Sequence, residues 1–389
     1  MSNIVGAFLY HTRDVRLDST YAVARLCAQL AEGLSNRPGF SINVFQEASL
    51  DCTEPERHFD KVSVRNGRLA KVVSRSLKPL RLRKLGSRLR LAAWYGRAAS
   101  AISPNTSFVL TCAAISVSWL RRRLPRMPIV LWIHDVPDIE ENFLGLTSAD
   151  LVVTASEYVR KRIWEGLKDK GCPMMMSVIP NMVDDGSFFP ASQDERVRYR
   201  RHFGVPVGSL VFGFASSFGK HKGLHILLRA MALLGRAGRW NRSGIPWLLV
   251  AGDGQDINAR PYKELAESLG VRMTFTGRLN PPELRCFYCC VDLMAVPSLW
   301  AEPFGLVALE SLLCGTPTFV SATGGLREIC REEANAVLVK CPNMPRAWAE
   351  AFAGFIESGV SAGPERPSHL STSGFIDRWV STLGECVIE

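Results

Sequence analysis

Two carboxylates with seven residues between them stand in the stretch AEPFGLVALESLLCGTPTFVSATGG, residues 301–325. Glu302 lies just ahead of an apolar segment, and Glu310 lies about two helical turns inside that segment. We expect a helix over residues 305–314, because Gly315 follows the last apolar residues as a C-terminal stop signal. Glu302 then stands between a strand end and a helix start, where parallel sheets bind their ligands.

The start of this helix can also hold an anion. The backbone N–H groups of Phe304, Gly305 and Leu306 belong to a helix N-terminus, which attracts negative charge. Glu302 can face a cleft from the strand end, and Glu310 can accept hydrogen bonds from hydroxyl groups. The set therefore predicts a ligand with both phosphate and hydroxyls, such as a nucleotide sugar. Two surface glutamates, one of them favouring the helix dipole, are the alternative that spacing alone leaves open.

A second anion site is indicated by GKHKGLHILLRAM, residues 219–231. Lys220, His221 and Lys222 directly precede an apolar helix that starts near Gly223. Cations at the positive end of a helix dipole cost about 0.3–1 kcal/mol each. This placement is explained if a phosphate binds there, and the alternative is a basic loop held in solvent.

Short apolar runs alternate with longer segments of helical periodicity, which predicts parallel sheets covered by helices on both faces. The strand-like runs are 3–10, 41–45, 107–112, 128–134, 150–156, 177–181, 210–216, 247–252, 273–277, 292–298, 318–322 and 336–340. The helix-like runs lie near 20–34, 157–169, 223–235, 261–269, 281–290, 305–314 and 345–358. The polar segment 181–209 is the expected junction between two doubly wound domains, whose ligand would bind in the cleft between them.

Length and charge narrow the class of protein. The 389 residues predict two domains, and the net charge of +10 is unevenly distributed. The region 61–134 contains no Asp or Glu, and subtracting its sixteen basic residues leaves the rest of the chain at about −6. The sixteen are Lys61, Arg65, Arg68, Lys71, Arg75, Lys78, Arg81, Arg83, Lys84, Arg88, Arg90, Arg97, Arg121, Arg122, Arg123 and Arg126.

The basic region 61–134 should seek an anionic surface. Nucleic acid is not expected, because the region has few aromatic residues and no recognised binding motif. Anionic lipid is the other candidate, since Leu82, Leu85 and Leu89 recur at helical spacing, typical of a helix lying on a bilayer. Five basic residues surround these leucines: Arg81, Arg83, Lys84, Arg88 and Arg90. A solvated basic face is the alternative.

A cytoplasmic location is expected. No run reaches the roughly 18 apolar residues of a membrane span, and the N-terminal residues lack a basic leader and a cleavage site. The eleven scattered cysteines are expected to be reduced and mostly buried. The cluster CFYCC, residues 286–290, has no partner histidine, so zinc is not expected there.

Several stretches, taken in order, resemble the retaining family-four glycosyltransferases of the GT-B fold, also described as glycosyl transferases group 1. EPFGLVALESLLCGTPTFVSATGGLREI is similar to the family signature, and SSFGKHKGLHILLRAMALL resembles its phosphate-binding stretch. WLLVAGDGQD, VRMTFTGRL and CVDLMAVPS follow in the family's order. SADLVVTASEYVRKRI and VIPNMVDDGSFFP resemble the end of its first domain, and GFIDRWVSTLGECV resembles its closing helix.

The resemblance implies an α/β protein of GT-B architecture, with two Rossmann-like domains facing a cleft. The acceptor domain would comprise residues 1–188, together with a returning C-terminal helix in 370–389, and the nucleotide-sugar domain would comprise 189–369. The implied activity is a retaining, metal-independent transfer of a hexosyl group from a UDP- or GDP-sugar to a glycan or lipid-linked acceptor. No cofactor and no metal ion are expected. Polysaccharide biosynthesis at the inner face of the membrane is the expected setting.

The resemblance also assigns roles to individual residues. Glu302 would contact hydroxyls of the transferred sugar, and Glu310 would accept bonds from the ribose. Lys222 would neutralise the diphosphate, helped by the amides of Phe304, Gly305 and Leu306. The remaining positions are Gly277 and Arg278 at the base pocket, Ser217 in the phosphate stretch, and His134 facing the sugar from the first domain.

Two departures from the family pattern bear on activity. Ser217 stands where the family has an arginine, so one cation for the leaving diphosphate is missing unless Lys220 or Arg278 supplies it. The first loop, residues 13–26, lacks the family's glycine pair near the acceptor. Asp18 or Ser19 is expected to cap the helix that follows this loop. The alternative function is therefore a catalytically impaired nucleotide-sugar-binding subunit with a regulatory or partner role.

Overall fold

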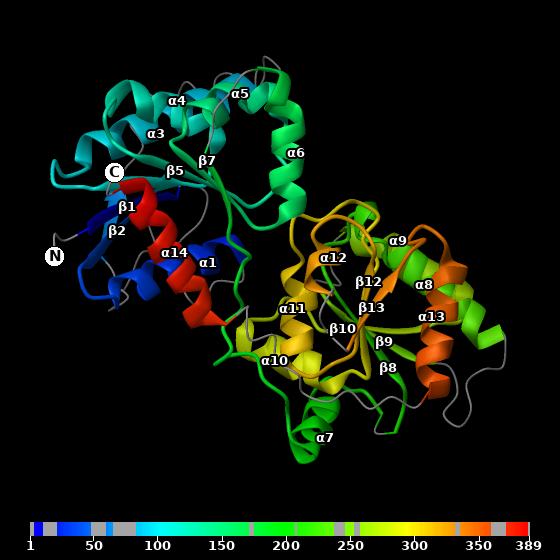
Figure 1. Cartoon of the computed structure of the whole chain (residues 1–389). Coiled ribbons are helices and arrows are strands. Elements are labelled where there is room, and N and C mark those ends of the chain that lie inside the picture. Colours follow the sequence, from blue (N-terminus) through cyan, green and yellow to red (C-terminus); the bar gives the residue numbers. More distant parts are fainter. Residues whose placement is uncertain are drawn as a thin grey trace. The chain divides into compact units, whose positions relative to one another are not determined.

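The computed structural model describes residues 4–10, 22–47, 60–64, 83–170, 175–206, 208–236, 246–252, 257–330, 335–358 and 371–387. The chain divides into two compact units (Figure 1). The first contains Met1–Pro180 together with Ser373–Glu389, and the second contains Asn181–Thr372. The predicted cap Asp18 or Ser19, the glycine-free first loop up to residue 21, and Arg81 with Leu82 lie outside the described residues.

The first unit contains a seven-stranded parallel sheet in the order β3-β2-β1-β4-β5-β6-β7. Its strands are β1 (Ile4–Tyr10), β2 (Phe40–Glu47), β3 (Asp60–Val64), β4 (Phe108–Thr111), β5 (Ile129–Ile133), β6 (Leu151–Thr154) and β7 (Met175–Val178). Its helices are α1 (Ala22–Ser35), α3 (Arg83–Ala101), α4 (Ala114–Arg123), α5 (Ile139–Ser148), α6 (Glu157–Leu167) and α14 (Thr372–Val387). Strands and helices alternate, which gives the doubly wound arrangement that the sequence predicts.

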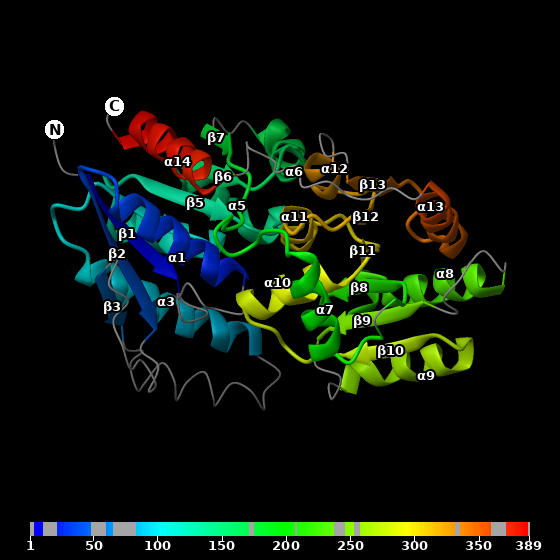
Figure 2. The same ribbon diagram turned by 90° about the horizontal axis from the view of Figure 1, so that it is seen from below.

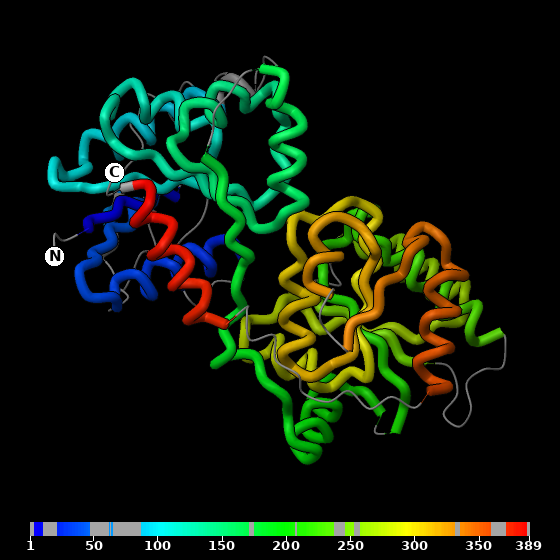
Figure 3. The backbone as a smooth tube through the Cα atoms, viewed as in Figure 1, coloured from blue at the N-terminus to red at the C-terminus, as the bar shows by residue number. Residues whose placement is uncertain are grey.

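The helices α1 and α14 lie side by side in the first unit (Figures 2 and 3). A Cβ atom at Gly33 of α1 would lie 2.3 Å from Ile376 of α14, so the glycine permits this close packing. Trp379 of α14 is fully buried, and its ring centroid lies 5.1 Å from that of Trp132 in β5. The C-terminal segment therefore completes the core of the first unit. The predicted closing helix, residues 374–387, coincides with α14.

A separate apolar cluster joins α3, α4, α5 and α6 to the sheet of the first unit. Trp94, Val117, Leu146 and Ile163 come from these four helices, and all are fully buried. In the described part of α3, Arg88 and Leu89 are exposed, and Arg88 forms an ion pair of 2.5 Å with Glu141 of α5. Among the residues that the structure describes, no helix combines the length and apolar character needed to cross a bilayer.

The second unit contains a six-stranded parallel sheet in the order β10-β9-β8-β11-β12-β13. Its strands are β8 (Val211–Ala215), β9 (Trp247–Ala251), β10 (Arg272–Phe275), β11 (Leu293–Val296), β12 (Thr318–Ser321) and β13 (Ala336–Val339). Its helices are α7 (Gln193–His202), α8 (Leu224–Arg236), α9 (Arg260–Leu269), α10 (Pro281–Cys290), α11 (Leu306–Leu313), α12 (Leu326–Ile329) and α13 (Pro345–Ser358). Side chains of α8, α9 and α13 form the main apolar cluster with this sheet.

The second unit begins at Asn181, earlier than the predicted boundary at residue 188. Contacts with the second unit are present at the predicted boundary itself. Phe188 is buried, and its ring centroid lies 6.1 Å from that of Tyr288 in α10. Arg285 of α10 donates a hydrogen bond of 3.0 Å to the carbonyl oxygen of Phe189. These contacts attach Phe188 and Phe189 to α10 of the second unit.

Candidate active site

The predicted donor-site residues of the second unit gather around the carboxyl ends of its strands. Because all strands in this sheet are parallel, loops that follow different strands meet at the same edge. The loop after β8 carries Ser217 and a 3₁₀ turn, Lys220–Lys222. The loop after β11 carries Ser298 and Glu302 before α11 begins.

Lys222 and Glu302 form an ion pair, with 2.9 Å between Nζ and Oε1. Their side chains are only 20% and 12% exposed. Ser298 Oγ donates a hydrogen bond to the same carboxylate oxygen, and the ammonium lies 5.2 Å from the ring centroid of Trp300. Lys222 is therefore held within the fold. This excludes, for Lys222, the alternative of a basic loop in solvent.

The position of Lys222 depends on two contacts between the loops. The N–H group of Leu299 donates a hydrogen bond of 2.7 Å to the carbonyl oxygen of His221. Gly223 has a φ of +74°, and a Cβ atom there would lie 1.8 Å from the carbonyl oxygen of Pro297. A residue with a side chain would be both strained and sterically blocked at this position. The glycine thus fixes the 3₁₀ turn against the end of β11.

The loop that carries Glu302 is held by a second glycine turn. The N–H group of Gly325 donates a hydrogen bond of 2.8 Å to the carbonyl oxygen of Glu302. A Cβ atom at Gly324 would lie 2.4 Å from that same oxygen, and one at Gly325 would lie 2.3 Å from the carbonyl oxygen of Pro303. Close backbone approach therefore explains the glycine pair after β12.

The start of α11 has the backbone geometry of an open helix N-terminus. Gly305 precedes the helix with a φ of +118°, in the left-handed region. The N–H group of Ala308 donates to the carbonyl oxygen of Gly305 at 3.0 Å, while Phe304 is buried. The amides of Phe304, Gly305 and Leu306 thus precede the first amide bonded within the turn, as a helix N-terminus requires.

Glu310 lies inside the unit. Its side chain accepts a hydrogen bond of 2.7 Å from the hydroxyl group of Tyr288, and the residue is 3% exposed. The alternative that Glu302 and Glu310 are two surface glutamates is therefore wrong. The contact with Tyr288 gives Glu310 a part in joining α10 to α11, while its predicted contact with ribose stays a prediction.

The other predicted donor residues lie farther along the same edge. Gly277, with a φ of +84°, donates from its N–H group to the carbonyl oxygen of Gly252 at 3.1 Å. Arg278 and Ser217 are exposed. Lys220, one candidate to replace the missing arginine, lines a hollow of about 540 Å³ beside α8 and α9. Roles for Gly277 and Arg278 at a base pocket stay predictions.

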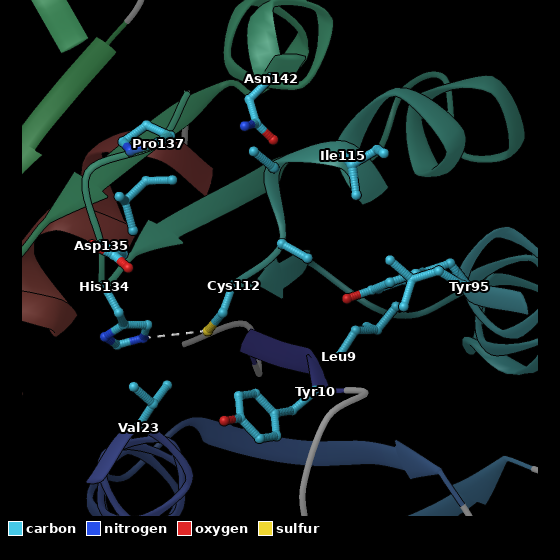
Figure 4. A pocket seen from close by; sticks show the side chains of 14 residues that line it. Leu9, Tyr10, Val23, Tyr95, Cys112, Ile115, His134, Asp135, Pro137 and Asn142 are labelled. Carbon is cyan, nitrogen blue, oxygen red and sulfur yellow. Dashed lines mark hydrogen bonds between the residues drawn. The ribbon is translucent and has the colours of Figure 1, made fainter. Parts of the chain in front are cut away.

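His134 lies in the first unit, at the carboxyl end of β5, and lines a cavity of about 420 Å³ (Figure 4). Its Nε2 atom lies 3.4 Å from Sγ of Cys112, which follows β4, and its ring centroid lies 4.2 Å from that of Trp132. Its Nδ1 atom is buried and has no hydrogen-bond partner in the described part of the chain. Figure 4 shows the imidazole and the thiol pointing toward each other.

A third group joins this pair. Sγ of Cys27, in α1, lies 3.8 Å from Sγ of Cys112. The hydrogen bond with Cys27, together with the nearby His134, lowers the pKa of Cys112 to about 6 although burial opposes the shift. Sequence reasoning missed this cluster, because its members lie in three distant segments. Only the strand order, in which β4 lies between β1 and β5, shows that these segments meet.

Comparisons with known proteins agree with this architecture. Residues 195–373 match the family model described as "Glycosyl transferases group 1". A D-inositol 3-phosphate glycosyltransferase of Corynebacterium jeikeium is 29% identical over 281 residues, covering 66% of this chain and 65% of that protein. An uncharacterized glycosyltransferase of Methanocaldococcus jannaschii is 32% identical over 236 residues, covering 56% and 57%. The matched part of this chain thus spans less than two thirds of either relative.

Among solved structures, Anabaena Alr3699/HepE in complex with UDP-glucose superimposes with a TM-score of 0.71. The match has 17% identity and covers 98% of this chain and 100% of that one. Two parallel sheets with this structural likeness define a protein of the GT-B fold. The segment 195–373 is thus similar to the glycosyl transferases group 1, and the relatives that match this chain are named as glycosyltransferases.

Proposed function

We propose that the protein transfers a sugar from a nucleotide-sugar donor to a hydroxyl group of a glycan or lipid-linked acceptor. The observation that carries the proposal is the partly buried Lys222–Glu302 pair, which lies where the loops after β8 and β11 meet. One member can neutralise a phosphate, and the other can accept hydrogen bonds from a sugar. A nucleotide sugar requires both functions from one site.

Lys222 can serve the donor while it keeps its contact with Glu302. A lysine ammonium has three N–H donors, and Glu302 accepts from it at 2.9 Å. The other donors are available to the leaving diphosphate, whose negative charge grows as the bond to the sugar breaks. Preorganised positive groups at such a position are often the largest catalytic contribution. The start of α11 would supply further N–H donors near Gly305.

We further propose that the transfer retains the anomeric configuration and uses no metal ion. Lys222 and the helix start would supply the positive charge that stabilises the diphosphate. The acceptor hydroxyl would attack from the side that the diphosphate leaves, and the leaving phosphate oxygen would accept its proton. Electrons and protons then balance without a dedicated base. His134 would face the transferred sugar from the first unit.

UDP-glucose is the first donor to test, because the structural relative from Anabaena binds that molecule. A thermal-shift screen with UDP-, GDP- and ADP-sugars would identify the donor, since a ligand that binds the folded state stabilises it. Product analysis with the stabilising donor should then detect the free nucleoside diphosphate and a glycosylated acceptor. If none of the nucleotide sugars raises the melting temperature, the proposal is wrong.

The exposed Ser217 favours a second candidate function. This position lacks the cation that the family pattern places near the leaving diphosphate. The chain would then bind nucleotide sugars as a catalytically impaired regulatory or partner subunit. Tight donor binding, with neither transfer to an acceptor nor slow hydrolysis of the donor, would support this function. Restored turnover in Ser217→Arg would show that the missing cation is the cause.

We also propose a cytoplasmic protein that contacts the inner face of the membrane through its basic region 61–134. The exposed residues Arg88 and Leu89 of α3 support this, although Glu141 shares the charge of Arg88. Replacing Arg81, Arg83, Arg88 and Arg90 together by Gln should reduce sedimentation with vesicles of anionic phospholipid. Donor binding should stay unchanged. Equal sedimentation of the variant would leave a solvated basic face as the explanation.

A further inference from the structure

Two thiols and one imidazole converge at the carboxyl edge of the first sheet. Cys27 comes from α1, Cys112 follows β4, and His134 follows β5. One ligand atom from each lies within 4.8 Å of the other two. Cys27 is buried, and Cys112 and His134 are half-buried and line the 420 Å³ cavity shown in Figure 4.

Two of the three distances within the cluster match those between ligands of a tetrahedral metal ion, and the third is at most 4.8 Å. With Zn–S bonds of about 2.3 Å and a Zn–N bond of about 2.0–2.1 Å, tetrahedral angles give roughly 3.8 Å between two sulfurs and roughly 3.5 Å between sulfur and nitrogen. The structure has 3.8 Å between the Sγ atoms of Cys27 and Cys112. It has 3.4 Å between Sγ of Cys112 and Nε2 of His134. Little movement is needed to admit an ion between them.

The chemistry of the donors selects the kind of ion. Thiolate and imidazole ligands favour Zn²⁺ over the hard cations Mg²⁺ and Ca²⁺, which prefer oxygen. Two thiolates and one neutral imidazole would bring the charge of a bound Zn²⁺ to zero, which suits a half-buried position. Three protein ligands leave one tetrahedral position, which the cavity can fill with water or another solute.

We propose that Cys27, Cys112 and His134 form a binding site for one Zn²⁺ ion, with the fourth coordination position open to the cavity. Both cysteines would bind as thiolates, any thiol proton still present would be released to solvent, and His134 would coordinate through Nε2. This inference departs from the sequence-based expectation that the chain holds no metal. One consequence rests on the proposed function: a bound Zn²⁺ ion would occupy His134 and inhibit sugar transfer.

The direct test titrates Zn²⁺ into the reduced full-length protein against a chromophoric chelator. One Zn²⁺ should bind per chain, and Cys112→Ser and His134→Ala should each weaken that binding by at least about tenfold, since even outer ligand partners contribute this much. The control is Cys341→Ser, which removes an exposed thiol and should leave the affinity unchanged. Equal affinity in Cys112→Ser and the unaltered protein would overturn the proposal.

A second measurement needs no variant and therefore does not depend on how the variants fold. Zn²⁺ should slow the alkylation of Cys112 by iodoacetamide, followed by peptide mass spectrometry, while Cys341 should react at an unchanged rate. Unprotected Cys112 at saturating Zn²⁺ would contradict the site. Neither readout involves sugar transfer, so the failure of the zinc site and the failure of the proposed function are distinguishable.

Discussion

The two units bring reactive groups to the carboxyl edges of their parallel sheets in different ways. In the second unit, Lys222 and Glu302 neutralise each other, and glycines fix their loops by close backbone contact. In the first unit, Cys27, Cys112 and His134 come from three separate elements, and their ligand atoms lie within 4.8 Å of one another. The arrangement in the second unit is suited to an anionic ligand with hydroxyls, and the arrangement in the first unit is suited to a soft metal ion.

The difference shows how far each site depends on remote parts of the chain. The pair in the second unit is built by two loops whose contacts involve neighbouring residues such as His221 and Leu299. The cluster in the first unit depends on the packing of β5. Trp132 in that strand contacts both His134 and Trp379, which lies at the far end of the sequence. Changes in α14 should therefore affect one unit and leave the other intact.

The largest expected effect tests this dependence directly. Trp379→Ala should cost about 3–5 kcal/mol of stability in the first unit, because a fully buried tryptophan is lost. Hydrogen exchange should become faster in peptides that cover β5 and stay unchanged in those that cover α11. The control Trp164→Ala removes a tryptophan that is 49% exposed and should change neither. Equal loss of protection in both units would refute the comparison.

The next largest effect concerns the ion pair. Lys222→Ala should lower turnover by about 10²–10³-fold, the usual cost of removing one charge-stabilising donor from an active site. The control Arg272→Ala removes an exposed cation at the amino end of β10, the opposite edge of the sheet, and should have little effect. The double variant Lys222→Ala/Glu302→Ala separates a catalytic from a structural role. If it recovers full turnover, the pair only joins two loops.

The smallest effect concerns Glu310, for which the structure offers two roles. Glu310→Gln should weaken donor binding about tenfold, equivalent to about 1.4 kcal/mol, if the carboxylate contacts ribose. Tyr288→Phe removes the hydroxyl that donates to Glu310 and should lower the melting temperature with little change in donor affinity. Calorimetry and thermal melting distinguish the two. Unchanged affinity in Glu310→Gln would leave only the contact between α10 and α11.

The sequence predicts most of the elements that carry the second unit's site, because their signals are local. The helix over residues 305–314 is observed as α11, and the strand-like run 292–298 contains β11. The short helices α4, α5 and α7 and the strand β3 were not predicted. Arg121, Arg122 and Arg123 interrupt the apolar pattern of α4, and α7 consists mostly of charged and polar residues. Tertiary contacts compensate for the missing pattern, as between α7 and Asp292.

The site residues also differ in how far the sequence predicts their surroundings. The family resemblance assigned Lys222 and Glu302 to one donor site, and the structure joins them by an ion pair. The burial of Glu310 could not be predicted, since it depends on how α10 packs on α11. The neighbours of His134 depend on strand order, and no spacing in the sequence brings Cys27 to Cys112.

Isothermal titration calorimetry can establish whether Lys222 holds the diphosphate of a nucleotide-sugar donor. The titration uses the donor selected by thermal shift, with the unaltered protein, Lys222→Ala and the control Arg272→Ala. We expect one binding site, a loss of affinity of at least about tenfold in Lys222→Ala, and near-unaltered affinity in Arg272→Ala. Equal affinity of the Lys222→Ala variant and the unaltered protein would contradict this role of Lys222.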